Sequence, residues 1–227
     1  MQSLSRAVAS AQIDIHPRLQ ETVRRHLSCE WRQPIHVPSV RMFERLSVLL
    51  RDDERPLLLD SGCGTGDSTL QLAALNPGHC VIGIDQSAAR LQRLAPLGIA
   101  LHANAILLRA ELTSFWRLFV AGGWRAERNY LLYPNPWPKA VYLNRRWHGH
   151  PVLPILLNTA SAIELRSNWR VYADEFAFAL TIAGHGEARA EPYDGEIPLT
   201  PFELKYRQSG HLLWRVAAPI ARSQGTT

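Results

Sequence analysis

Three glycines alternate with other residues directly after an apolar run that ends in an acid, in the order Asp60, Gly62, Gly64 and Gly66. Glycine tolerates positive φ and has no Cβ, so such a loop turns sharply and lets a ligand lie against bare amides. A second apolar run ends in Asp85, roughly 20 residues further on, where an acid is placed to accept hydrogen bonds from a ribose. The order strand, glycine loop, helix, strand and acid therefore predicts a site for a ligand that carries a ribose.

The glycine spacing differs from the dinucleotide fingerprint G-x-G-x-x-G, and no Lys-Ser or Lys-Thr follows to make a phosphate-binding P-loop. It resembles motif I of class I S-adenosylmethionine-dependent methyltransferases. The resemblance implies that Asp60 and the glycines hold the methionine end of the cofactor and that Asp85 holds the ribose hydroxyls. The alternative is that Asp60 only caps a turn and Asp85 only caps the next helix.

A proline-rich loop with the sequence YPNPWPK covers residues 133–139. Three prolines in five residues cannot continue a strand, so they force a rigid turn that presents Asn135 and Trp137. Such a loop suits the binding of a flat base, and three cations follow at a distance suited to phosphate contacts. These cations are Lys139, Arg145 and Arg146. The alternative is a structural proline turn with a packed Trp.

The loop and the residues after it resemble the bacterial tRNA (guanine-N7-)-methyltransferases. Their signature P-D-P-W-P-K, followed by a basic cluster ending in R-R, is close to PNPWPKAVYLNRRW in this chain. Ala173-Asp174 is similar to their later T-D pair, and TPFE at residues 200–203 to their C-terminal T-x-F/Y-E. The resemblance runs from Leu57 to the C-terminal strand near Trp214. It implies an enzyme that methylates N7 of guanine in tRNA.

The same resemblance implies roles for individual residues. It implies cofactor contacts from Asp60, Asp85 and Glu111, the last near the adenine. It implies contacts with the guanosine or its surroundings from Lys139, Asp174, Thr200 and Glu203. The chain departs from the family in two ways: Asn135 stands at the catalytic position, where the family has aspartate, and the basic cluster is thinned by Ala140, Val141 and Asn144.

The amide of Asn135 changes what chemistry is expected. Guanine N7 has an in-plane lone pair, so attack needs no base, only alignment at about 3 to 3.5 Å and stabilisation of the purine cation. An amide supplies no charge, so we expect a slower enzyme or a changed target. Asn135-Pro136-Trp137 also resembles the (D/N)-P-P-(Y/F/W) loop of amino-methyltransferases, without the second proline. Transfer to an exocyclic or amide nitrogen is therefore the first alternative, and a catalytically silent RNA-binding relative is the second.

Apolar runs alternate with helical segments from residue 57 onward. This alternation predicts an α/β fold with parallel β-α-β units, which is a doubly wound, mostly parallel, Rossmann-like sheet. Ligands of such sheets bind beyond the carboxyl ends of the strands. Five polar residues lie at or just past predicted strand ends, so we expect them to converge on one crevice. They are Asp60, Asp85, Glu111, Asn135 and Asp174.

Two predicted elements after the proline loop depend on short apolar patterns. Val152, Ile155, Leu156, Ala160 and Ile163 share one helical face, which predicts a helix that begins near Pro151. The run Trp169–Ala173 predicts the fifth strand, which would end at Asp174.

The N-terminal part has a different character from the rest of the chain. Residues 1–15 show no period and we expect them to be loosely held, whereas His16–Cys29 and Val40–Leu50 predict helices. We therefore expect an N-terminal helical extension over residues 1–53 and a methyltransferase domain over residues 54–227.

Composition limits the kinds of partner. A chain of 227 residues with 46% hydrophobic residues has enough apolar material for a core without disulfides or a metal. The net charge of +5 suits a polyanion such as tRNA, and a solvated basic surface is the alternative.

Three cysteines without C-x-x-C spacing argue against a disulfide framework and a zinc site. Because the sequence lacks a long apolar run and a signal peptide, we expect a cytoplasmic protein. We also expect a monomer.

Overall fold

The computed structural model describes residues 5–221, and contacts within the chain divide it into two compact units. Of the described residues, unit 1 comprises 5–32, 133–157 and 162–221, and unit 2 comprises 33–132 and 158–161. The predicted boundary between residues 53 and 54 is a different division of the chain and stays a prediction.

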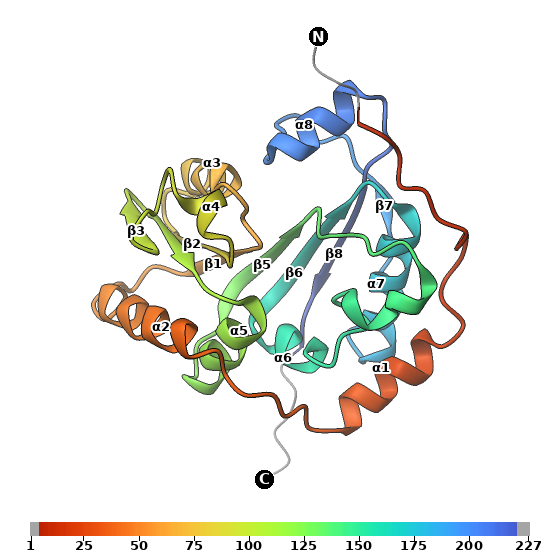
Figure 1. The fold of residues 1–227 in the computed structure, drawn as a ribbon, viewed down its shortest axis with the longest axis horizontal. Coiled ribbons are helices and arrows are strands. Elements are labelled where there is room, and N and C mark those ends of the chain that lie inside the picture. Colours follow the sequence, from red (N-terminus) through yellow and green to blue (C-terminus); the bar gives the residue numbers. More distant parts are fainter. Residues whose placement is uncertain (1–4, 222–227) are drawn as a thin grey trace. The chain divides into compact units, whose positions relative to one another are not determined.

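Unit 2 contains the strands in the order β3-β4-β2-β1-β5 (Figure 1). Strands β4, β2, β1 and β5 run parallel, and β3 pairs antiparallel with β4. The elements of unit 2 are α2 (Val37–Leu49), β1 (Leu57–Ser61), α3 (Asp67–Leu75), β2 (Cys80–Asp85), α4 (Ala88–Leu91), β3 (Ile99–His102), β4 (Ala105–Arg109), α5 (Leu112–Ala121) and β5 (Ala126–Leu132).

Unit 1 contains antiparallel strands, with β8 between β6 and β7. Helix α1 lies against α7 (Figure 1). Both helices bury apolar side chains. The elements are α1 (Leu19–Ser28), the 3-10 helix η1 (Ala140–Arg145), α6 (Leu153–Asn158), β6 (Ala160–Ser167), α7 (Arg170–Ile182), β7 (Glu191–Pro192), α8 (Pro201–Gln208) and β8 (Trp214–Pro219). Residues 158–161, which include the last residue of α6 and the first two residues of β6, belong to unit 2.

The central parallel strands of unit 2 are apolar because both of their faces are covered. All six residues of β2 are buried, as are four of the five in β1. Helix α3 approaches β2 so closely that a Cβ on Gly83 would lie 2.1 Å from Oγ1 of Thr69. Glycine at position 83 is therefore what allows α3, and the loop before it, to sit directly against the sheet.

A buried polar chain connects β1 with α5 and β5. The indole N–H of Trp116 donates to Oγ of Ser61 at 3.0 Å, and Ser61 donates to Oδ1 of Asn129 at 2.8 Å. The amide of Asn129 donates to Oγ1 of Thr159 at 2.9 Å. Because buried polar groups are costly unless they are hydrogen-bonded, this chain fixes the side-chain arrangement behind the carboxyl end of β1.

Two predicted elements after the proline loop differ from the structure. The helix near Pro151 is only α6, and Ala160 and Ile163 belong to strand β6. The run Trp169–Ala173 is not a strand, because Trp169 precedes α7 and Arg170 begins it. Short apolar runs fit a buried strand and a helix equally well, and here tertiary packing decides.

The N-terminal segment is held in place rather than loose over residues 5–16. The backbone N–H of Ser5 donates to Oγ of Ser209 at 2.9 Å, and Oγ of Ser10 donates to the carbonyl of Pro138 at 2.6 Å. Residues 1–4 lie outside the described residues.

In the described part of the chain, every helix is too short or too polar to span a membrane.

Candidate functional site

The glycine loop of unit 2 turns through left-handed backbone at each of its three glycines. Their φ values are 86° at Gly62, 60° at Gly64 and 87° at Gly66, a region that other residues enter only at a cost. A Cβ on Gly66 would lie 2.9 Å from the methyls of Leu107, whereas a Cβ on Gly64 would meet no atom of the described residues within 4 Å. The loop is therefore packed at Gly66 and open at Gly64.

Asp85 ends β2 and binds the glycine loop. Its Oδ2 accepts from the backbone N–H of Gly64 at 3.0 Å, and its Oδ1 accepts from the N–H of Ser87 at 2.8 Å. The side chain is nearly fully buried, and the exposed Arg90 lies 3.5 Å from Oδ2. A carboxylate has about four acceptor positions, so Asp85 retains capacity for further donors such as hydroxyls.

Asp60 lies in β1 beneath the loop and is only 1% exposed. Its Oδ2 accepts from the hydroxyls of Ser68 at 2.6 Å and Thr69 at 2.7 Å, both in the first turn of α3. Its Oδ1 has no hydrogen-bond partner among the described residues. Burial raises the pKa of Asp60 to about 6, with the two hydroxyls opposing the shift. A buried oxygen without a partner is costly, so it favours a bound donor.

Glu111 precedes α5 and caps it. Its Oε2 accepts from the N–H of Ser114 at 2.9 Å, and its Oε1 accepts from the hydroxyl of Thr113. Burial raises the pKa of Glu111, but these hydrogen bonds outweigh burial, so the pKa lies below its usual value. Glu111 is therefore ionised at neutral pH, and its contact with an adenine stays a prediction.

These residues fit S-adenosylmethionine. Gly64 leaves open space beside bare backbone, Asp60 offers a buried oxygen that no described residue contacts by a hydrogen bond, and Asp85 ends the neighbouring strand. The alternative, in which both acids only cap local structure, accounts for Ser68, Thr69 and Ser87 but not for this oxygen of Asp60.

The proline loop of unit 1 is a tight turn between two left-handed residues. Tyr133 has φ of 52° and Trp137 has φ of 45°, although neither is glycine. The side chain of Asn135 is exposed, and its Oδ1 accepts from the backbone N–H of Trp137 at 3.3 Å. The predicted turn that presents Asn135 is therefore present in the structure, and its rigidity stays a prediction.

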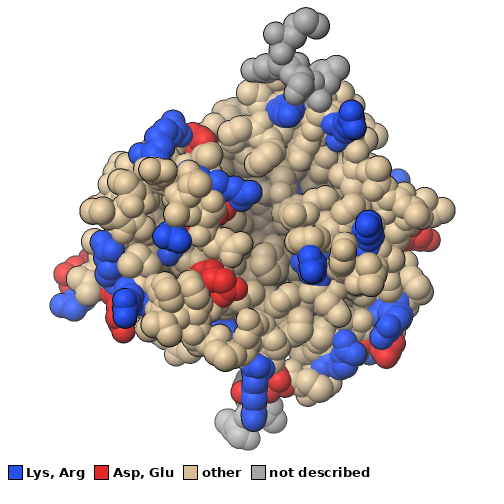
Figure 2. Space-filling view, viewed as in Figure 1, with Lys and Arg blue, Asp and Glu red and all other residues tan. Residues whose placement is uncertain are grey.

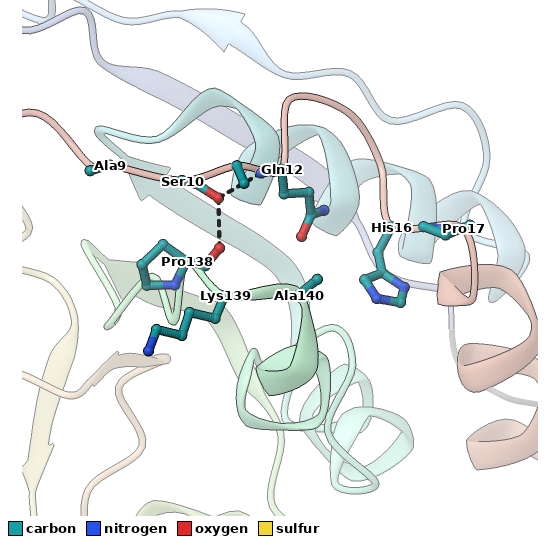
Figure 3. Close-up of a pocket in the computed structure, with 9 residues that line it drawn as sticks. Ala9, Ser10, Gln12, His16, Pro17, Pro138, Lys139 and Ala140 are labelled. Atoms are coloured by element: carbon teal, nitrogen blue, oxygen red, sulfur yellow. Dashed lines mark hydrogen bonds between the residues drawn. The ribbon is translucent and has the colours of Figure 1, made fainter.

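Lys139 precedes η1 and Arg145 is its last residue, and both side chains are exposed. The guanidinium of Arg145 lies 4.6 Å from the ring centre of Trp137 and 4.7 Å from that of Tyr142, a cation–π arrangement. Lys139 lines a cavity of about 790 Å³ between the N-terminal segment and the loop, in which Gln12 and His16 also lie (Figure 3). Both cations are available to an anion, and their phosphate contacts stay a prediction.

Arg146 does not fit its predicted role as a phosphate contact. Its side chain is fully buried, and its Nη1 pairs with Glu175 at 2.5 Å. Its other nitrogens donate to carbonyl oxygens of the loop and to Gln12. Because the guanidinium of Arg146 is buried and hydrogen-bonded within unit 1, it stabilises the proline loop and does not contact RNA phosphates.

Asp174 also lies elsewhere than predicted. It is in the second turn of α7, where it pairs with Arg170 at 3.3 Å, and is not at a strand end. The residues that follow β6 are Asn168 and Trp169. The prediction that Asp174 belongs to the set of polar groups at strand ends is therefore wrong.

Thr200 and Glu203 form the start of α8. Oγ1 of Thr200 accepts from the N–H of Glu203 at 2.9 Å, which is an N-cap. Glu203 is fully buried between Arg166 at 3.0 Å and Arg207 at 2.7 Å. Both residues thus hold α8 in place, and contact with a guanosine stays a prediction for each.

Figure 2 shows how charged side chains are distributed over one face of the protein. On the face drawn in Figure 2, Lys and Arg side chains stand apart from one another, and some lie beside Asp or Glu. Among the described residues, no group of His, Cys, Asp and Glu is arranged to hold a metal ion.

Sequence reasoning missed the residues that support the two loops. Ser68 and Thr69 bind Asp60, and their position in the first turn of the helix after a glycine loop was a signal for them. Gln12 and Glu175 bind Arg146, but they are far from it in the sequence and no local pattern marks them. The convergence of the residues of unit 1 and unit 2 on one crevice stays a prediction.

Comparison with protein families matches residues 54–214 to a family described as putative methyltransferase. A tRNA (guanine-N(7)-)-methyltransferase of Burkholderia pseudomallei (strain 1710b) is 26% identical over 166 residues, which cover 70% of this chain and 62% of that protein. The protein of the same name from Leifsonia xyli subsp. xyli (strain CTCB07) is 26% identical over 170 residues, with 70% and 74% covered. The chain thus spans less than two thirds of the Burkholderia relative.

Solved structures give the same fold class. The 16S rRNA methyltransferase KamB superposes with a TM-score of 0.57 at 16% identity, covering 84% of this chain and 96% of that one. The antibiotic-resistance methyltransferase Kmr has a TM-score of 0.52 at 19% identity, with 78% and 92% covered. The predicted α/β methyltransferase fold is therefore confirmed.

Proposed function

This chain belongs to the family of putative methyltransferases, and from that premise we propose that it transfers a methyl group from S-adenosylmethionine to N7 of guanine in tRNA. The observation that carries the proposal is the glycine loop, where Asp85 binds the Gly64 amide and Asp60 keeps a buried oxygen that accepts from no described residue. The names of the relatives and the proline loop support the choice of tRNA guanine.

Three acids and the glycine loop hold the cofactor. Asp60 and the glycines bind the methionine end, Asp85 accepts from the ribose hydroxyls, and Glu111 lies near the adenine. When bound, S-adenosylmethionine supplies a methyl group that its sulfonium makes electrophilic. Because Gly64 has no Cβ and the space beside it is open, the cofactor is able to lie against the backbone.

The proline loop orients the base. Asn135 is exposed in a turn that its own hydrogen bond to Trp137 helps to fix, and Lys139 and Arg145 meet phosphates nearby. Thr200 and Glu203 shape the surroundings of the base by fixing α8. N7 has an in-plane lone pair, so no residue has to remove a proton, and alignment together with charge stabilisation provides the rate.

Asn135 sets the expected speed of the reaction. The purine becomes a cation as its N7 is methylated, and the amide oxygen of Asn135 meets that charge with a dipole instead of a full negative charge. We therefore infer a slower enzyme than one with aspartate at this position.

The amide of Asn135 also supports a second candidate function, which is transfer to an exocyclic amine. An amide carbonyl accepts a hydrogen bond from an amine and so orients it. A silent RNA-binding relative remains the alternative from a different class.

Transfer of labelled methyl groups into bulk tRNA, followed by nucleoside analysis, tests the proposal. We expect label in 7-methylguanosine. Label in an N-methylated amine supports the second candidate, and RNA binding without label contradicts both enzymatic functions.

A further inference from the structure

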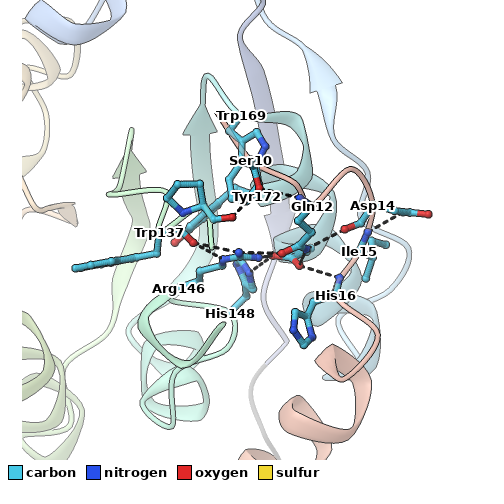
Figure 4. Close-up of polar contacts among 12 residues, drawn as sticks. Ser10, Gln12, Asp14, Ile15, His16, Trp137, Arg146, His148, Trp169 and Tyr172 are labelled. Carbon is cyan, nitrogen blue, oxygen red and sulfur yellow. Dashed lines mark hydrogen bonds and ion pairs between the residues drawn. The ribbon is translucent and has the colours of Figure 1, made fainter. Parts of the chain in front are cut away.

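A buried guanidinium binds backbone carbonyl groups of the proline loop. Nε and Nη2 of Arg146 donate to the carbonyl oxygen of Trp137 at 3.2 and 3.1 Å, and Nη2 also donates to that of Lys139 at 3.4 Å (Figure 4). The same guanidinium lies 4.9 Å from the ring centre of Trp169. One side chain thus fixes two carbonyl groups of the loop that presents Asn135.

Trp137, whose carbonyl accepts two hydrogen bonds from Arg146, has a strained backbone conformation. Trp137 has φ of 45°, and a non-glycine residue persists in that region only when its surroundings determine it. Its carbonyl is bound by Arg146, and its N–H is bound by Oδ1 of Asn135. The backbone of Trp137 therefore connects the guanidinium of Arg146 with the side chain of Asn135.

Glu175 of α7 fixes Arg146 in turn. Its Oε2 accepts from Arg146 and, at 2.8 Å, from Nε2 of His148. Its Oε1 accepts from Nε2 of Gln12 at 2.6 Å and from the N–H of His16 at 2.9 Å. Burial raises the pKa of Glu175, but hydrogen bonds and the charge of Arg146 outweigh it and hold the pKa at about 2. The carboxylate is ionised and compensates the buried cation.

Gln12, from the N-terminal segment, contacts both Arg146 and Glu175. Its Oε1 accepts from Nη2 of Arg146 at 3.0 Å while its Nε2 donates to Glu175 (Figure 4). The side chain therefore bridges both members of the ion pair, and its neighbour Ser10 binds the carbonyl of Pro138. Through Gln12, a segment 134 residues away from Arg146 in sequence contacts the support of the loop.

We propose that Glu175 and Gln12 are positioning residues, which act through Arg146 to hold the loop of residues 135–139 in its reactive shape. The inference rests on the proposed function, since it assigns that loop to the substrate. It gives the N-terminal segment a role in turnover that is separate from the cofactor site in unit 2.

Gln12→Ala is the sharpest test, because it removes both bridging hydrogen bonds and leaves the Arg146–Glu175 pair intact. Substituting Glu175 would leave a buried cation without its partner and risk unfolding. Turnover at saturating tRNA and S-adenosylmethionine should fall about tenfold or more, since small displacements of reacting groups are costly. KM for tRNA and Kd for S-adenosylmethionine should change by less than about twofold.

Ser209→Ala is the matched control. It removes the acceptor for the N–H of Ser5 at the other end of the same segment and leaves Gln12 untouched. Its turnover should equal that of the wild type. An equal loss in Ser209→Ala and Gln12→Ala would overturn the proposal, because the effect would then belong to the segment as a whole.

Hydrogen exchange of the peptide covering residues 133–146 provides a readout that needs no activity. Gln12→Ala should exchange faster in this peptide than the wild type and Ser209→Ala. If the wild type methylates no tRNA, the proposed function fails, and faster exchange in Gln12→Ala still supports the positioning role. Unchanged exchange and unchanged turnover in Gln12→Ala overturn it.

Discussion

The carboxylate of Asp85, the last residue of β2, accepts a hydrogen bond from the backbone N–H of Gly64 at 3.0 Å. This bond joins the end of one parallel strand to the loop that follows its neighbour, across 21 residues of sequence. The acid that we propose to bind the ribose of the cofactor therefore also holds the glycine loop.

Asp85→Ala should weaken binding of S-adenosylmethionine by about 1.5 to 3 kcal/mol, the range for hydrogen bonds to a charged group. The measurement is titration calorimetry. Asp53→Ala is the control, because Asp53 is another carboxylate of unit 2 but is ion-paired with Arg55 and precedes β1, whereas the glycine loop follows it. Equal affinity of wild type and Asp85→Ala would contradict the assignment of the ribose site.

Asp60 should make stability depend on pH. Its pKa is raised to about 6 from the ordinary 3.8, so between these values the folded protein holds a proton that the unfolded chain has lost. The contribution of Asp60 to the free energy of unfolding therefore falls as pH rises through this window and is constant above pH ~7.

Asp60→Asn removes this titration and keeps an acceptor for Ser68 and Thr69. The free energy of unfolding of the variant minus that of the wild type should increase by roughly 1 kcal/mol between about pH 5 and pH 7. Urea unfolding of both proteins at each pH measures it. A difference that stays constant across this range would show that the pKa of Asp60 is not raised in the folded protein.

Much of unit 2 follows from local sequence patterns. The apolar runs of β1 and β2, the glycine loop and the acids at strand ends are short-range features, and the structure contains them in the expected order. The strand after α6 and the helix after Trp169 were assigned wrongly, because short apolar runs fit both states.

The support of the proline loop lay outside what sequence patterns indicate. Arg146 is one of two adjacent arginines, and nothing local distinguishes it from the exposed Arg145. Its burial depends on Glu175, 29 residues further on, and on Gln12, 134 residues before it. Pairs so far apart meet only once the fold has formed.

Lys139 and Arg145 should each contribute one phosphate contact. Replacing either by Ala should flatten the salt dependence of tRNA binding by about 0.7 to 0.9 in slope per contact. Arg189→Ala is the control, since Arg189 is an exposed cation paired with Glu187. Filter binding over a range of salt concentrations measures the slopes. If the Lys139→Ala and Arg145→Ala variants had the same slope as Arg189→Ala, neither cation would contact RNA phosphates.

Asn135→Asp should accelerate the enzyme if N7 is the target. A carboxylate stabilises the purine cation better than an amide does, so the methylation rate should increase by about tenfold or more. Single-turnover rates with saturating tRNA provide the comparison. A wild type that methylates N7 efficiently and a variant that loses activity would show that the amide itself is required.

Methyl transfer into tRNA transcripts made with guanosine or with 7-deazaguanosine tests the central claim most directly. The two transcripts keep the same exocyclic amine, but the second has a C–H in place of N7 and therefore no lone pair to methylate. We predict transfer of label from S-adenosylmethionine to the guanosine transcript and none to the 7-deazaguanosine transcript. Equal transfer to both would contradict guanine N7 as the target.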